Sequence, residues 1–126
     1  MKLYQKIASS IQAHKNCIEI GNKEWEDNHY VTLMEYSNLL PSGSGFDSGT
    51  TIDIEKSTPN KIYLNTSYHY MNHHGYYGDW YEYQVIVTPS LAGVIELRIV
   101  GKNTLNDIKY YMQELFYNTL NEEYTE

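Results

Sequence analysis

The chain has 126 residues, which fits one domain, and 41% of them are hydrophobic, enough for one core. Its net charge is −7, and its nine basic residues are scattered along the chain, so we expect no direct binding to nucleic acid. A single cysteine, Cys17, excludes an intrachain disulfide, and no apolar run approaches the roughly 20 residues that span a bilayer. The first residues show no secretory signal, and a single cysteine is typical of a reducing compartment. We therefore expect a cytoplasmic protein that does not bind a membrane.

Two runs of apolar and aromatic residues in the first forty positions recur at helical spacing. The first run comprises Leu3, Ile7, Ile11, His14 and Ile18. The second comprises Trp25, His29, Leu33, Tyr36 and Leu40. Between them, Gly21 favours a helix end and Asn22 favours a helix start. The pattern predicts amphipathic helices over about residues 3–18 and 23–39, joined as an αα-hairpin.

The second half of the chain is predicted to form a sheet and a last helix. Alternating residues predict strands of one antiparallel sheet at 51–55, 62–71, 80–88 and 94–100. Thr104 with Asp107 matches a helix-start signal and predicts a C-terminal helix over 104–120. We therefore expect a single α+β domain over residues 1–126, in the order ααββββα. The residues expected in its core are Ile7, Ile11, Leu33, Leu64, Val85, Val87, Leu97, Ile99, Ile108, Met112 and Leu115.

The glycine-rich segment 41–50 and the lone cysteine carry no recognisable catalytic motif. The segment lacks the Lys-Ser/Thr pair of a phosphate-binding P-loop, and Ser48 stands one position late for a nucleophile elbow. Cys17 falls at the end of a predicted helix, where the dipole does not stabilise a thiolate. We expect a connecting loop here, with a backbone nest that contacts a partner as the alternative.

Three histidines, His69, His73 and His74, cluster near Asp79. Imidazole and carboxylate groups are suitable ligands for zinc or nickel, but this spacing matches no ligand motif. His73 and His74 are adjacent, so in extended chain their side chains point apart. We therefore expect no catalytic residue, no structural metal and no cofactor.

Aromatic residues are concentrated between positions 63 and 83, in a chain that contains 14 tyrosines. Alternation sends their rings to both faces of a sheet of which the helices can cover only one, so the surplus rings are expected to be exposed interface anchors. The alternative is that these rings pack against one another across the strands. The loop 72–79 is too long for a two-residue turn and is expected to project. The predicted partner-binding residues are Phe46, Tyr68, Tyr70, His73, His74, Tyr76, Tyr77 and Trp80.

Three strings in the sequence resemble small proteins of phages and mobile elements from gut-type bacteria. They are LPSGSGFDSG (Leu40–Gly49), SYHYMNHHGYY (Ser67–Tyr77) and NDIKY (Asn106–Tyr110). The resemblance assigns no role to individual residues, but it implies a setting. Short acidic proteins of such elements often block host defence nucleases, as anti-CRISPR proteins do.

The function expected from these observations is that of a non-enzymatic inhibitor. It would bind a host protein, a CRISPR effector or another nuclease, by protein–protein contact in the cytoplasm of a bacterial host. One alternative is a small hydrolase that depends on His and Asp or on a metal. Another is an accessory or structural protein of a mobile element. The sequence leaves the oligomeric state open.

Overall fold

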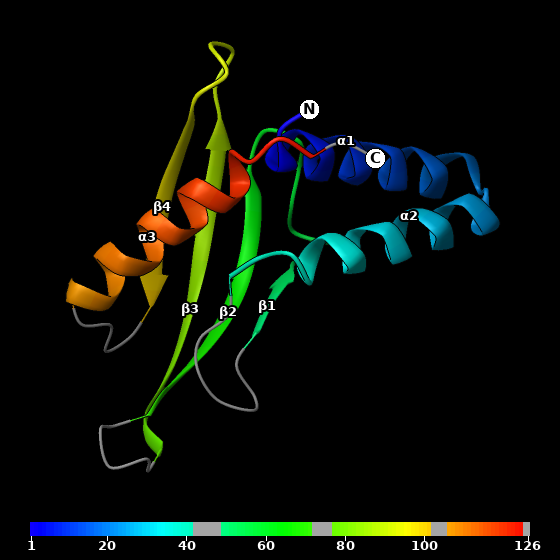
Figure 1. Ribbon diagram of the computed structural model, residues 1–126. Helices are drawn as coiled ribbons and strands as arrows, with labels where there is room; N and C mark the ends of the chain where they lie inside the picture. The colour runs from blue at the N-terminus through cyan, green and yellow to red at the C-terminus, as the bar shows by residue number, and fades with distance from the viewer. Residues whose placement is uncertain (42–48, 72–76, 102–105, 125–126) are drawn as a thin grey trace.

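The computed structural model describes residues 1–41, 49–71, 77–101 and 106–124 of the chain. Within these residues it contains three helices and a four-stranded antiparallel sheet in the order ααββββα (Figure 1). The elements are α1 (Leu3–Ile20), α2 (Lys23–Ser37), β1 (Gly49–Ile52), β2 (Ile62–Met71), β3 (Tyr77–Pro89), β4 (Ile95–Gly101) and α3 (Asn106–Leu120). The α+β architecture expected from the sequence is confirmed.

The first strand is displaced by two to three residues from its predicted position. It was expected at 51–55 but covers Gly49–Ile52, because the chain turns at Asp53. The Asp53 carbonyl accepts from the Ser57 N–H at 3.0 Å, and its carboxylate accepts from the Lys56 N–H at 3.2 Å. Both bonds hold the backbone in a turn that cannot also pair as a strand.

Other boundaries differ from the prediction by one to three residues: α1 ends at Ile20 rather than at 18, for example, and β4 covers Ile95–Gly101 rather than 94–100. The second helix ends at Ser37 rather than at 39, and β3 begins at Tyr77, which shortens the predicted loop 72–79 by its last three residues. The rest of that loop, at 72–76, and the predicted helix start at Thr104 lie outside the described residues.

The turn between α1 and α2 forms as its residue types predict. Gly21 adopts a left-handed φ of 73°, which a residue with a side chain rarely takes up. Its N–H donates to the Ile18 carbonyl at 3.2 Å, and the Asn22 N–H donates to the Cys17 carbonyl at 2.9 Å. The Asn22 side chain then accepts from the Trp25 N–H at 3.3 Å and caps α2. The two helices therefore fold back on each other as an αα-hairpin.

The sheet has the strand order β1-β2-β3-β4, with every neighbouring pair antiparallel. Ile62 pairs with Val87 and Leu64 with Val85, and these four residues are fully buried on one face. On the opposite face, the paired residues include Asn65 and Gln84, whose side chains share a hydrogen bond of 2.9 Å. Along 62–67 and 82–88 the predicted alternation is thus confirmed.

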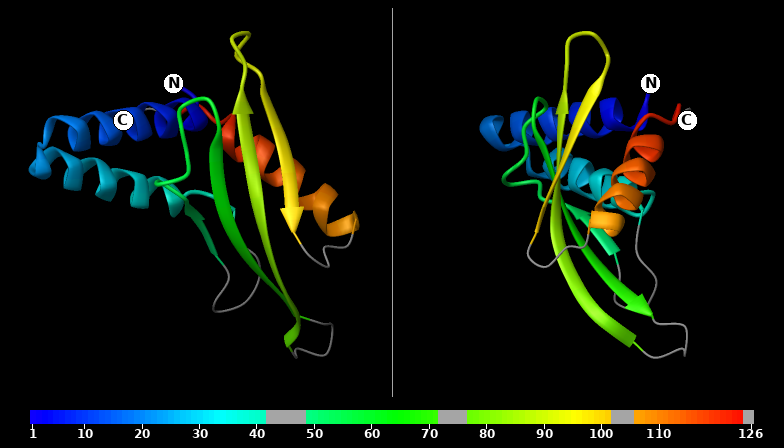
Figure 2. Two further views of the ribbon diagram at one scale, coloured as in Figure 1. Left: turned by 180° about the vertical axis from the view of Figure 1, so that it is seen from behind. Right: turned by 90° about the vertical axis from the view of Figure 1, so that its left-hand side faces the viewer.

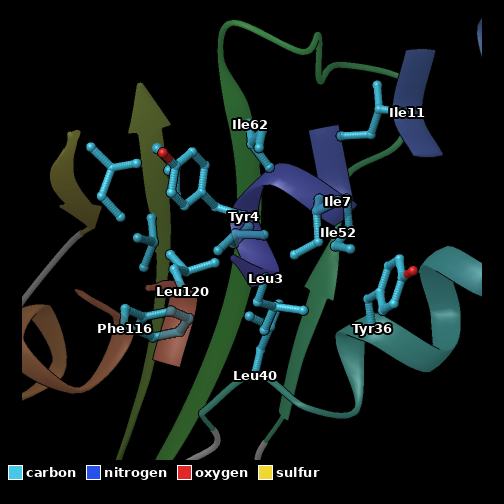
Figure 3. Close-up of a cluster of buried hydrophobic side chains, with 14 of the residues drawn as sticks. Leu3, Tyr4, Ile7, Ile11, Tyr36, Leu40, Ile52, Ile62, Phe116 and Leu120 are labelled. Atoms are coloured by element: carbon cyan, nitrogen blue, oxygen red, sulfur yellow. The ribbon is translucent and has the colours of Figure 1, made fainter. Parts of the chain in front are cut away.

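All three helices contribute to covering the buried face of the sheet. The helix α3 lies across the part formed by β3 and β4, and the packed ends of α1 and α2 lie beside β1 and β2 (Figures 1 and 2). Side chains from the helices and from the strands meet in one cluster (Figure 3). The buried apolar residues are Leu3, Tyr4, Ile7, Ile11, Leu33, Tyr36, Leu40, Ile52, Ile62, Leu64, Tyr83, Val85, Val87, Ile95, Met112, Phe116 and Leu120.

Three residues expected in the core are only partly buried. Leu97 and Ile99 pack against the core from β4, an edge strand with a neighbour on one side only. Leu115 lies at the margin of the buried face of α3. The side chain of Ile108 lies outside the described part of the chain. The other seven predicted core residues are buried, so the periodic pattern located the core but not its edge.

The αα-hairpin extends well past the β1 side of the sheet (Figures 1 and 2). Burial along α1 falls accordingly: Ile7 and Ile11 are 0% exposed, His14 is 9% exposed and Ile18 is 52% exposed. On α2, Leu33 is 0% exposed whereas Trp25 is 55% exposed. The apolar stripes of both helices are therefore buried at the end near the sheet and exposed to solvent at the other end, because the sheet stops partway along the hairpin.

Candidate functional site

The predicted partner-binding residues fall into two groups in the structure. Phe46, His73, His74 and Tyr76 lie outside the described residues. For Tyr68, Tyr70, Tyr77 and Trp80 the structure describes the backbone, in β2 and β3. Whether their rings are exposed therefore stays a prediction.

The backbone of the β2–β3 hairpin nevertheless brings these aromatic positions together. The register pairs Tyr68 with Tyr81, and His69 with Trp80, and it shifts between His69 and Met71 at an irregularity. The end of the hairpin that carries these residues reaches beyond β1 and β4 (Figure 1). The sequence thus placed Tyr68, Tyr70 and Trp80 in two neighbouring strands, whereas Tyr77, expected in the loop 72–79, is the first residue of β3.

A pocket on the αα-hairpin was not foreseen from the sequence. It measures about 350 Å³ and is mostly apolar. Its walls come from α1, from α2 and from the turn that follows β1, and its residues are His14, Lys15, Ile18, Tyr30, Ile54 and Glu55. We call this feature the hairpin pocket. Its volume lies at the lower end of the range for ligand pockets, about 300–1,000 Å³.

His14 supplies a buried polar group to the hairpin pocket. Its side chain is 9% exposed, and Nδ1 has no hydrogen-bond partner within the part of the chain that the structure describes. The imidazole lies 6.4 Å from the ring of Tyr30, measured between centroids, with the rings tilted by 43°. A buried polar atom without a partner costs free energy on the order of 1–3 kcal/mol. The imidazole therefore places a polar atom without a described partner beside the apolar lining of the pocket.

Two exposed side chains, Ile18 and Tyr30, make the pocket accessible. Ile18 is 52% exposed and Tyr30 is 49% exposed, and both continue the helical faces that are buried nearer the sheet. Lys15 and Glu55 add one charge of each sign to the lining. The arrangement is suited to receiving an apolar side chain, with a charge of either sign available beside it.

The start of α2, close by in the chain, carries a small charge cluster. The Lys23 ammonium lies 3.0 Å from the Asp27 carboxylate and 3.6 Å from that of Glu26. The hydrogen bond and the charge of Asp27, followed by the charge of Glu26, raise the pKa of Lys23 above its ordinary value. Lys23 and Asp27 are largely exposed to solvent, whereas Glu26 is partly buried. Ion pairs this exposed contribute little to the free energy of unfolding, so the cluster mainly affects the surface charge.

Other functional arrangements have less support in the described residues. No group of three His, Cys, Asp or Glu residues within them could hold a metal ion, while the predicted cluster includes His73 and His74, which lie outside them. Among the described helices, none is long and apolar enough to cross a membrane. Comparisons of the chain with protein-family models, with curated proteins and with solved structures find no match.

The sequence indicated which residues of α1 share the face that lines the hairpin pocket, but it did not indicate that this face is left uncovered. The steps of three and four along α1 placed His14 and Ile18 on one face. What the spacing could not show is where the sheet stops beneath that face. Ile54 and Glu55, expected in a strand, instead belong to a turn that closes one side of the pocket.

Proposed function

We propose that the chain is a non-enzymatic protein-binding module, and that the hairpin pocket is one of its contact surfaces. The observation that carries this proposal is the exposure of Ile18 and Tyr30 beside an apolar pocket at the projecting end of the αα-hairpin. An exposed apolar side chain next to a hollow is a common form of interface hot spot. The occupant would be an apolar side chain presented by the target protein.

The target we propose is a host defence nuclease, a CRISPR effector or another enzyme of this class, in the cytoplasm of a bacterial host. Two observations support it. The sequence resembles small phage and mobile-element proteins through the strings at Leu40–Gly49, Ser67–Tyr77 and Asn106–Tyr110. The net charge of −7 also favours contact with a basic surface, such as the groove in which a nuclease holds its nucleic acid.

A titration tests this function directly. Purified RNA-guided nucleases and restriction endonucleases are mixed with rising amounts of the chain, and cleavage of a fluorescent DNA substrate is followed. We expect cleavage by one of them to stop when the chain and the nuclease are equimolar. Loss of activity far below equimolar amounts would indicate an enzyme, such as the hydrolase considered above, and no inhibition of any nuclease in the panel would contradict the proposed target.

Variants then locate the surface on the chain. Ile18→Asp places a charge at the mouth of the hairpin pocket and is expected to weaken inhibition at least about tenfold. Glu35→Gln, on an exposed position of α2 away from the pocket, is the matched control and should inhibit normally. The double variant Tyr76→Ala with Tyr77→Ala tests the predicted aromatic surface in the same assay. If only this double variant loses inhibition, the contact surface is the β2–β3 hairpin and not the pocket.

A further inference from the structure

The two edges of the sheet differ in length and in regularity. The strand β1 has four residues, and α2 packs against it. The strand β4 has seven residues and pairs with β3 in an unbroken register from Ile95 to Gly101. Within the described residues, β4 has no strand on its other side. Natural proteins protect such an edge with a bulge, a proline or charged side chains, and of these β4 has only the two exposed charges Glu96 and Arg98.

The side chains of β4 alternate in a pattern that is nearly symmetric about Leu97. On the open face of the sheet, Glu96 and Arg98 are exposed on either side of it. Farther out on the same face, Val94 just before the strand is 52% exposed and Val100 is 43% exposed. On the core face, Ile95 is buried and Ile99 is partly buried.

The two charges on β4 find no ion-pair partner within the described part of the chain. Glu96 lies opposite Thr88 of β3, and Arg98, the only arginine of the chain, lies opposite Ile86. None of the ion pairs formed among the described residues includes either Glu96 or Arg98. On the open face, Glu96 and Arg98 line one hollow together with Lys61, but no described group of opposite charge lies within ion-pair distance of either.

A second copy of β4 can place an opposite charge directly across from each of these two side chains. When two antiparallel β4 strands meet at a two-fold axis beside Leu97, Leu97 faces its own copy and each residue faces the one equally far on the other side. Glu96 then lies opposite Arg98 of the second copy, and Arg98 lies opposite Glu96. Val94 meets Val100 on the open face, and Ile95 meets Ile99 on the core face.

The same charges disfavour the neighbouring registers. A two-fold axis one residue earlier places Glu96 opposite its own copy, and an axis one residue later does so for Arg98. Like charges directly opposite each other in a sheet are destabilising. The pair Glu96–Arg98 thus favours the Leu97 register and disfavours a slip in either direction.

The helix α3 packs on the core face of β4, next to the outer edge of the strand. It crosses β4 on the core face, and its N-terminal end reaches past the edge of the strand (Figures 1 and 2). The two-fold axis that joins the strands brings the two α3 helices onto the same face of a common sheet. On the exposed side of α3, Tyr110 is 75% exposed and Tyr117 is 43% exposed, and with Gln113 and Glu114 they line a hollow of about 460 Å³.

From this pattern we infer that the chain forms a symmetric homodimer, in which two β4 strands pair around Leu97 into one continuous eight-stranded sheet. The partner that the β4 edge fits is a second copy of this chain, because its own side chains are complementary to themselves in one register. The inference is independent of the proposed function, since neither the hairpin pocket nor a nuclease takes part in it.

Charge exchange tests the register. Sedimentation velocity across the micromolar range is expected to show a dimer of the unmodified chain. Glu96→Arg and Arg98→Glu each replace two attractive pairs with two repulsive ones, and each should weaken dimerisation at least about tenfold. The double variant Glu96→Arg with Arg98→Glu restores opposite charges across the axis and should restore the dimer. Glu35→Arg, an exposed change on α2, is the control that should leave the dimer intact.

A cysteine cross-link tests the axis by a second route. In a Cys17→Ser background, Leu97→Cys places two thiols directly opposite each other within disulfide reach, and mild oxidation should link the chains. Ile99→Cys faces Ile95 of the other copy and should not cross-link efficiently. Circular dichroism checks that each variant is folded. A monomeric unmodified chain would overturn the proposal, and so would a dimer that neither single charge variant weakens.

Discussion

The two halves of the αα-hairpin share one helical pattern but lie in different environments. In the half nearer the sheet, Ile7 and Leu33 are fully buried. In the projecting half, Ile18 and Trp25 continue the same patterns and are more than half exposed. The difference teaches that helical spacing determines which residues share a face, whereas burial of that face requires another element to cover it. The four changes below are expected to separate the two halves, from the largest effect to the smallest.

Ile7→Ala tests the packed half and should have the largest effect. The side chain is 0% exposed and belongs to the core cluster, so its truncation loses buried apolar surface and leaves a cavity. We expect the free energy of unfolding to fall by about 2–5 kcal/mol. Urea denaturation followed by circular dichroism measures it. A loss below about 0.5 kcal/mol would show that the packed half is as dispensable as a surface position.

Gly21→Ala tests the turn that ends the projecting half. No atom lies within 4 Å of the added Cβ, so the cost arises from the left-handed φ of 73° alone. We expect a loss of about 1 kcal/mol in the free energy of unfolding. Gly49→Ala is the matched control, because it also meets no neighbouring atom and has no left-handed φ, and it should not destabilise the fold. Equal losses in the two variants would disprove this account of Gly21.

His14→Leu tests the boundary between the two halves. The variant replaces the imidazole, whose Nδ1 has no hydrogen-bond partner among the described residues, with an apolar side chain of similar size. We expect the protein to gain about 1 kcal/mol in the free energy of unfolding. His29→Leu, at a partly exposed position on α2, is the control and should change little. Destabilisation by His14→Leu would show that the imidazole makes a favourable contact.

Ile18→Ala tests the projecting half and should have the smallest effect. The residue follows Ile7, Ile11 and His14 on the same face of α1, yet it is 52% exposed. We expect the free energy of unfolding to change by no more than about 0.5 kcal/mol. Urea denaturation of Ile18→Ala and Ile7→Ala under identical conditions compares the stability contributed by the projecting half with that contributed by the packed half. If both variants lose the same stability, the projecting half is covered in solution, and a larger assembly must account for it.

The β half of the chain repeats this lesson at the edge of the sheet. Alternation located β2 at Ile62–Met71 and assigned Leu64 and Val85 to the core. The same alternation put Leu97 in the core, but β4 has a neighbouring strand on one side only, so Leu97 is partly buried. Of the contact residues predicted from the sequence, Tyr68, Tyr70, Tyr77 and Trp80 lie in β2 and β3, and their role stays a prediction because their side chains lie outside the described residues.

The sequence by itself determined the type and order of the helices and strands, because these depend on interactions between residues a few positions apart. Helical spacing, strand alternation and the turn residues Gly21 and Asn22 act over a few positions, so they predicted the order ααββββα. Only the tertiary structure determines where the sheet stops beneath the αα-hairpin. The hairpin pocket forms at that point, between segments some forty residues apart that include His14 and Ile54. The tertiary structure also determines that β4 is an edge strand. Such features depend on which elements come to lie side by side, and no local pattern contains that information.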